Sequence, residues 1–145
     1  ILVGANLTFS SFIGADFSGS NLQGANFTNS RISTASFREA DLSGANLQMT
    51  EAVLVCMVHA ILCNINAFGS SMIGADLSGA DLHGALLHGT DMSGANLSSA
   101  NLSEARFIET ILVAADLSMA DLRGTPLMKA ETKRARFDNA KLDPS

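Results

Sequence analysis

Residues 74–98 read GADLS GADLH GALLH GTDMS GANLS, five consecutive pentapeptides of one pattern. The register extends over the 145-residue chain, and all 12 glycines fall at positions that leave a remainder of four on division by five. Of the 29 positions divisible by five, 18 are Ala, 5 are Ser and 4 are Thr, with Val55 and Ile65 as the exceptions. Two residues further on, 26 of 29 positions hold Leu, Phe, Met or Ile, the others being Ala52, Ala67 and Thr132.

A period of five residues fits neither an α-helix nor an alternating strand. It is typical of a short extended segment followed by a tight turn. Glycine then marks the turn position that needs a positive φ, as in a type II turn. We expect the large apolar column and the Ala/Ser/Thr column to point inward, and the columns rich in Asp, Asn and Ser to face water.

The length of one coil follows from reading the large apolar column at steps of 20 residues. If four segments close a square, one side becomes an uninterrupted ladder of leucines: Leu2, Leu22, Leu42, Leu62, Leu82, Leu102, Leu122 and Leu142. This supports 20 residues per coil and about seven coils, which gives a rod roughly 35 Å long at an interstrand spacing of about 4.8 Å.

The segments Gly-Ala-Asn-Leu-Thr (4–8), Gly-Ala-Asp-Leu-Ser (74–78) and Gly-Ala-Asn-Leu-Ser (94–98) resemble the Ala-(Asp/Asn)-Leu-X-X unit of pentapeptide-repeat proteins. The resemblance covers nearly the whole chain. It implies an all-β fold, a right-handed quadrilateral parallel β-helix (a solenoid) whose interior is filled by side chains. The handedness agrees with the general rule for parallel strand crossovers. We therefore expect residues 1–145 to form a single β-helix domain.

The segment at about 48–71 departs from the pattern, because residues 52–63 are almost wholly apolar. It is either an inserted loop or helix, or a degenerate coil that stays in register. The coil is favoured because Leu47 and Met72 are five whole repeats apart. The coil would place a hydrophobic belt on the outside, and such patches usually mark contact surfaces. The belt residues are Val53, Leu54, Val58, Ile61, Phe68, Ile73 and Val113.

The charge balance argues against some partners. The chain has 14 acids, 9 bases and a net charge of -5, which disfavours direct binding to nucleic acid. Residues 1–122 carry -8 and residues 123–145 carry +3. No apolar run reaches the roughly 20 residues that a membrane-spanning helix needs.

Fourteen Asp and Asn residues directly precede the central apolar residue of a repeat. Their simplest role is to accept hydrogen bonds from the turn backbone. The family resemblance offers an alternative, because members that confer quinolone resistance resemble B-form DNA in shape and charge and bind type II topoisomerases.

Nothing in the sequence indicates catalysis. No Ser, His and carboxylate set stands out, no glycine-rich loop precedes a helix, and a packed β-helix leaves no substrate cavity. We expect no cofactor. Cys63 and His83 would be neighbours in one outward column, with His88 one side over, but they do not supply a four-ligand metal site. Cys56 and Cys63 would lie on different sides, which argues against a disulfide.

We therefore predict a non-enzymatic rigid scaffold or protein-interaction module that acts through the belt or an end of the rod. The alternative is a DNA mimic that binds or inhibits a type II topoisomerase. The apolar start, Ile1, Leu2 and Val3, shows no cap and predicts a homodimer formed end to end. The protein partner and the cellular compartment stay open; the family resemblance points to bacteria, where such proteins are abundant.

Overall fold

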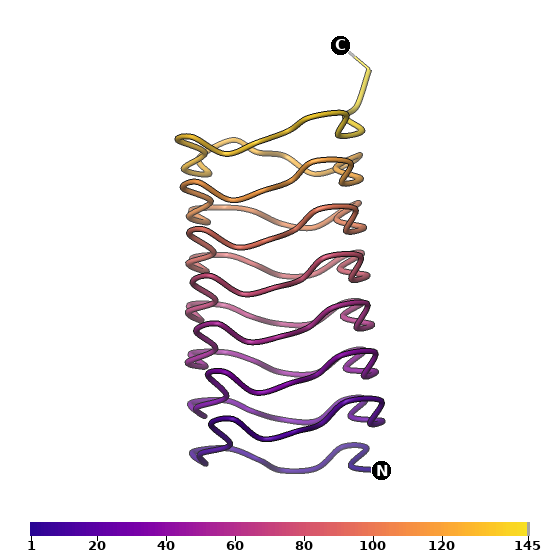
Figure 1. Ribbon diagram of the computed structural model, residues 1–145, viewed down its shortest axis with the longest axis vertical. Coiled ribbons are helices and arrows are strands. Elements are labelled where there is room, and N and C mark those ends of the chain that lie inside the picture. The colour runs from indigo at the N-terminus through magenta and orange to yellow at the C-terminus, as the bar shows by residue number, and fades with distance from the viewer. Residues whose placement is uncertain (145) are drawn as a thin grey trace.

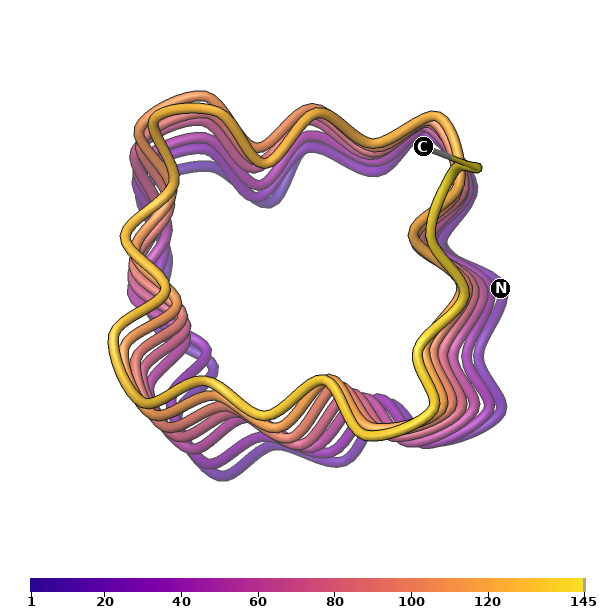
Figure 2. The same ribbon diagram turned by 90° about the horizontal axis from the view of Figure 1, so that it is seen from above.

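The computed structural model describes residues 1–144 and shows a stack of square coils (Figures 1 and 2). No helix occurs in this range, and each strand is so short that one bridging residue stands between two turns. Parallel bridges join residues 20 apart, from Asn6 and Asn26 at one end to Asp121 and Lys141 at the other. The predicted right-handed quadrilateral β-helix with 20-residue coils is confirmed.

The four sides of the square are named here by their first central residue. Face 1 contains Leu2 and every twentieth residue after it, and faces 2, 3 and 4 begin at Leu7, Phe12 and Phe17. On each face, the residues directly before and after the central residue form two outward columns. The residue two positions after each central residue, such as Gly4 after Leu2, forms the corner between two faces.

Backbone hydrogen bonds use four of the five N–H groups in a regular repeat, as residues 81–85 show. The N–H groups of Leu82 and Gly84 donate to carbonyl oxygens of the next coil at 2.7 and 3.0 Å. The N–H of Asp81 donates to the preceding coil at 2.9 Å, and the N–H of Ala85 closes the turn on the Leu82 carbonyl at 3.0 Å. Stacking therefore satisfies the backbone without long strands.

The fifth N–H of the repeat belongs to the Asp/Asn column. In every one of the fourteen repeats with Asp or Asn before the central residue, Oδ1 accepts a hydrogen bond from the N–H two residues later at 2.9–3.2 Å. This is the local turn bond expected of these side chains. The acidic column is therefore explained by the backbone that it supports.

The corners adopt the left-handed conformation predicted from the glycine column. The twelve glycines have φ between 63 and 71°, and sixteen other corner residues, Phe9, Glu39 and Leu54 among them, have φ between 53 and 70°. A side chain in this region costs roughly 1 kcal/mol, so the repeat geometry imposes the conformation even where glycine is missing.

The core is one continuous column of side chains. Between Leu22 and Leu122, every residue of the two inward columns is at most 2% exposed. Most of the Ser and Thr residues in the small column bond to backbone: the hydroxyls of Thr50, Thr90 and Thr110 donate to carbonyls 23 residues earlier at 2.6–3.0 Å. These bonds offset the cost of burying a hydroxyl.

Residues 48–71 continue the stack in register, with Glu51 bridging Ser71 and Cys56 bridging Asp76. In this segment the order of small and large core residues is reversed at one repeat. Ile65 occupies a position of the small column and Ala67 the adjacent position of the large column, and both are buried. Total side-chain volume is conserved, which cores tolerate well.

Pro126 interrupts the ladder on face 2. It has no N–H to donate, and within residues 1–144 no bridge joins it to Arg106. The N–H groups of Leu87 and Gly89 donate to the next coil at 3.1 and 3.0 Å, whereas no such bond is present at the equivalent residues 107 and 109 of the described chain. The last two coils are therefore less tightly joined on this face.

Candidate functional site: the carboxylate-free face

Face 2 differs from the other three faces in its charge. Its two outward columns contain no Asp or Glu: one reads Asn6, Asn26, Asn46, Asn66, Leu86, Arg106, Pro126, and the other Thr8, Thr28, Gln48, Phe68, His88, Ile108, Met128. The outward columns of faces 1, 3 and 4 each hold carboxylates, as at Asp81, Glu51 and Asp76. On a chain with a net charge of -5, face 2 is the face from which acidic groups are missing.

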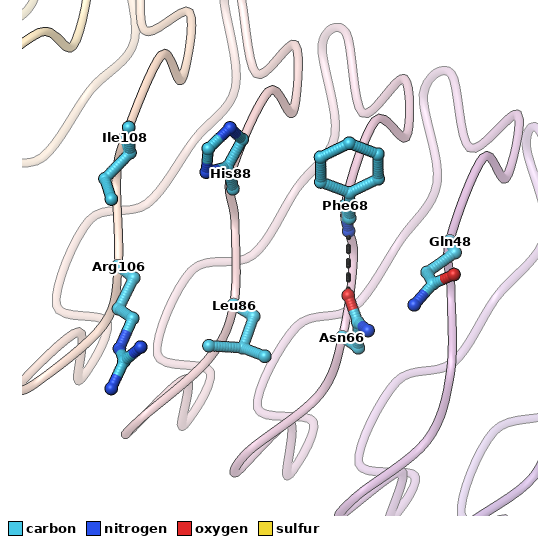
Figure 3. A pocket seen from close by; sticks show the side chains of 7 residues that line it. All are labelled: Gln48, Asn66, Phe68, Leu86, His88, Arg106 and Ile108. Carbon is cyan, nitrogen blue, oxygen red and sulfur yellow. Dashed lines mark hydrogen bonds between the residues drawn. The ribbon is translucent and has the colours of Figure 1, made fainter.

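The second half of face 2 is apolar and solvent-exposed. The residues that form this apolar stripe are Phe68, Leu86, Ile108 and Met128, with exposed fractions of 47, 37, 39 and 78%. Figure 3 shows Phe68, His88 and Ile108 in successive coils, beside a second row formed by Asn66, Leu86 and Arg106. Four large apolar groups on one face form a patch of the kind that marks a contact site.

A groove of about 350 Å³ runs between the two rows (Figure 3), with Gln48 at one end and Ile108 at the other. Its wall is held locally, because the Asn66 Oδ1 accepts a hydrogen bond from the Phe68 N–H at 3.1 Å. The ring centroids of Phe68 and His88 are 5.4 Å apart. The His88 Nε2 is 3.8 Å from the Glu109 Oε2 at the adjoining corner.

Arg106 is the cation of this groove. It is the only Lys or Arg between residues 39 and 122. Its side chain is exposed, and it forms no ion pair with any carboxylate of residues 1–144. The groove therefore combines apolar walls with an uncompensated positive charge.

The break at Pro126 extends the hollow along the same face. One cavity of about 470 Å³ has Arg106, Ile108, Pro126 and the corner residue Glu104 in its lining, and another of about 240 Å³ is lined by Ile108, Pro126, Met128 and Lys129. Both adjoin the groove through Ile108. The concave surface of face 2 thus follows the apolar stripe.

The belt residues predicted from the sequence are distributed around the rod, on different faces. Ile61 lies on face 1, Ile73 on face 3 and Leu54 at a corner, with 42, 40 and 61% exposed, and only Phe68 belongs to face 2. Val53 and Val113 are half-buried on face 3.

The expectation for Val58 is wrong, because it is buried, at 7% exposure. Its neighbours in the same column, Arg38 and Ser78, lie one coil away on either side, about 4.8 Å at the usual spacing.

The sequence prediction did not include Leu86, Ile108 and Met128, which are exposed on face 2. The sequence does contain a signal for them. When the outward columns of each face are compared at steps of 20 residues, only face 2 has no carboxylate. At the other predicted interface, Ile1, Leu2 and Val3 are 100, 37 and 56% exposed.

The cysteines and histidines do not assemble a metal site within residues 1–144, where no group of three such ligands occurs. The His83 Nδ1 is hydrogen-bonded to the Ser103 Oγ at 3.0 Å. Burial, with a hydrogen bond and charge from Asp81, raises the pKa of the Cys63 thiol to about 11. The thiol is therefore protonated at neutral pH and a poor nucleophile. No helix in residues 1–144 is long and apolar enough to cross a membrane.

Comparison with solved structures gives the same fold. A trypsin-treated variant of QnrB1, described as a plasmid-mediated fluoroquinolone resistance protein, matches with a TM-score of 0.63 and 20% identity over 98% of this chain and 85% of that chain. A second trypsin-treated variant gives a TM-score of 0.52 and 20% identity over 95 and 89%. HetL from Nostoc sp. strain PCC 7120, a pentapeptide repeat protein, gives 0.38 and 26% identity over 94 and 84%.

Sequence comparison identifies the family. No curated protein sequence matches the chain significantly. A family profile described as pentapeptide repeats (8 copies) matches residues 1–38, 21–53, 58–89 and 90–127. These matches cover most of the chain and agree with the square coils, so the protein belongs to the pentapeptide repeat family.

Proposed function

We propose that this protein is a non-enzymatic interaction module, a rigid rod that binds a partner protein through the apolar stripe on face 2. The observation that carries the proposal is a coincidence on one face. The missing carboxylates, the four exposed apolar side chains and the three cavities all lie there. Interfaces favour aromatic, Met and Arg residues and have few charges at their centres.

Rigidity supports a scaffold role. The continuous buried core and the repeated backbone bonds hold successive coils in a fixed register. Side chains on one face therefore keep their spacing in the free protein, which reduces the entropy lost on binding. The belt residues on the other faces, and pairing through Ile1, Leu2 and Val3, stay predictions, which light scattering across a range of concentrations tests for self-association.

Site-specific photo-crosslinking in the cells that produce the protein tests the proposal. A benzophenone amino acid is placed at position 108 or, as the control, at position 28, where Thr28 occupies the same column on the polar half of face 2. We expect a discrete protein adduct from position 108 and none from position 28. Equal adducts from both positions, or none from either, would contradict the proposal.

A second candidate function is inhibition of a type II topoisomerase by DNA mimicry. It is supported by the fold likeness to QnrB1, a fluoroquinolone resistance protein. The net charge of -5 is modest for a phosphate mimic, and one oxygen of each aspartate that precedes a central residue is engaged by the turn backbone. A supercoiling assay with DNA gyrase separates the two candidates. We expect no effect at a large molar excess, and inhibition near stoichiometric amounts would favour mimicry.

A further inference from the structure

The spacing of the coils limits what can lie along face 2. One outward column of this face places Phe68, His88, Ile108 and Met128 in successive coils about 4.8 Å apart, or about 14 Å over three steps. One turn of an α-helix advances about 5.4 Å, so three turns cover about 16 Å. Alternate residues of an extended strand cover about 20 Å over three steps. Over three steps the side chains of a helix along the rod fall out of register with the coils by less than half the coil spacing. The side chains of a strand fall out of register by more than one whole coil spacing.

The shape of face 2 argues against a second copy as the occupant, because two copies would place groove against groove, with no protruding surface to fill either one. Arg106 has no ion-pair partner within residues 1–144. The outward columns of face 2 hold no acid, and the acids that border the face are the corner residues Glu104 and Glu109. The complementary surface is convex and apolar and carries at least one acid.

We infer that the face 2 groove binds an amphipathic α-helix of a partner protein, with a carboxylate of that helix paired to Arg106. The inference rests on the proposed function and specifies the class of partner. The apolar side of the helix, repeating at i, i+4, i+7 and i+11, packs between Phe68, Leu86 and Ile108. The carboxylate approaches the guanidinium from the helix flank. Because Arg106 is exposed, this pair contributes mainly to the choice of partner and to the rate of association.

The test uses three fluorescein-labelled helical peptides and fluorescence polarisation. The first has leucines at i, i+4, i+7 and i+11 with glutamates flanking the leucine stripe. The second replaces each flanking glutamate by lysine, and the third places a proline at the centre of the first. We expect the glutamate peptide to bind, and the other two to bind at least tenfold more weakly.

Variants of the protein assign the contact. Arg106→Glu should reverse the preference between the glutamate and lysine peptides. Ile108→Asp should abolish binding of the glutamate peptide. Ile13→Asp is the matched control, because Ile13 occupies the equivalent column on face 3, lies outside the predicted belt and is 47% exposed against 39% for Ile108. It should leave the affinity unchanged, and circular dichroism verifies that all variants are folded.

Several results would overturn the helix inference. These are a failure of the glutamate peptide to bind, equal binding of the proline peptide, or a charge preference that Arg106→Glu does not alter. A dimer in light scattering that Ile108→Asp dissociates and Ile13→Asp does not would replace the helix by a second copy. A photo-adduct from position 108 without peptide binding removes the helix and leaves the proposed function standing, whereas loss of the adduct removes the proposed function itself.

Discussion

The size exchange in the core of face 2 allows a quantitative test of how the β-helix is packed. Ile65 stands where the coils on either side have alanine, and Ala67 stands where they have Leu47 and Leu87. Both exchanged side chains are 0% exposed. Because leucine and isoleucine have the same composition, the double substitution Ile65→Ala with Ala67→Leu restores the regular pattern without changing the number of buried atoms.

The expected free energies of unfolding follow from packing. Ile65→Ala alone removes most of a fully buried side chain and leaves a cavity, which should cost about 3 kcal/mol. Ala67→Leu alone inserts extra carbon atoms beside Ile65 and should cost about 2 kcal/mol through overpacking. Together the changes conserve volume, so the double variant should lose less than about 1.5 kcal/mol. The coupling between the two positions is then at least about 3.5 kcal/mol.

Urea unfolding followed by far-ultraviolet circular dichroism measures these changes, since the chain has no Trp or Tyr for intrinsic fluorescence. The slope of the transition should stay the same in the four proteins, which shows that the unfolding unit is unchanged. Additive losses in the double variant, within about 0.5 kcal/mol, would refute the reasoning, because independent sites add. They would mean that the two positions do not share one packing volume.

Three further predictions concern the backbone and the charges. Asn46→Ala removes the acceptor for a turn N–H and should cost about 1 kcal/mol in urea unfolding, whereas Asn46→Asp keeps the acceptor, has asparagines in the coils on either side and should cost little. The Arg123 guanidinium lowers the pKa of Asp121 to about 2. The stability from this pair is therefore present above about pH 4 and is lost as the pH falls towards 2. NMR titration of Arg123→Ala should show the Asp121 pKa shifted back towards its ordinary value. Pro126→Ala supplies the missing N–H, and amide exchange at Phe107 should slow as the ladder closes.

The fold was predictable because each level of the sequence specifies the same period. Glycine at the corner, a small residue and a large apolar residue recur every five positions, and leucine recurs every 20 on one face. The period fixes which residues point inward, and the stacking distance then determines the backbone bonds. The role of the Asp/Asn column was predictable for the same reason, since it depends only on the local turn.

The surface was less predictable because exposure of an outward residue depends on neighbours 20 positions away. Val58 points outward and is still buried at 7%, whereas Phe68, in the same column position of the next-but-one repeat, is 47% exposed. The opening at Pro126 likewise requires knowledge of Arg106, the residue at the same position in the preceding coil, with which Pro126 forms no bridge. A solenoid therefore has to be interpreted face by face before its contact surface can be located.

Face 2 also reveals a conflict between stability and binding. In its first four coils, Asn at the position before the central residue accepts a hydrogen bond from the turn N–H. From Leu86 onward that acceptor is missing. Leu86→Asn should restore it and stabilise the fold by about 1 kcal/mol, while removing an apolar wall of the groove and weakening the partner adduct from position 108. Ser71→Asn on face 3 is the control, because it should bring the same stabilisation with binding retained. Proteins usually forgo stability where function requires it, so the missing acceptor at Leu86 is explained if this side chain binds the partner. If Leu86→Asn stabilised the protein and left the adduct intact, the apolar stripe would have no binding role.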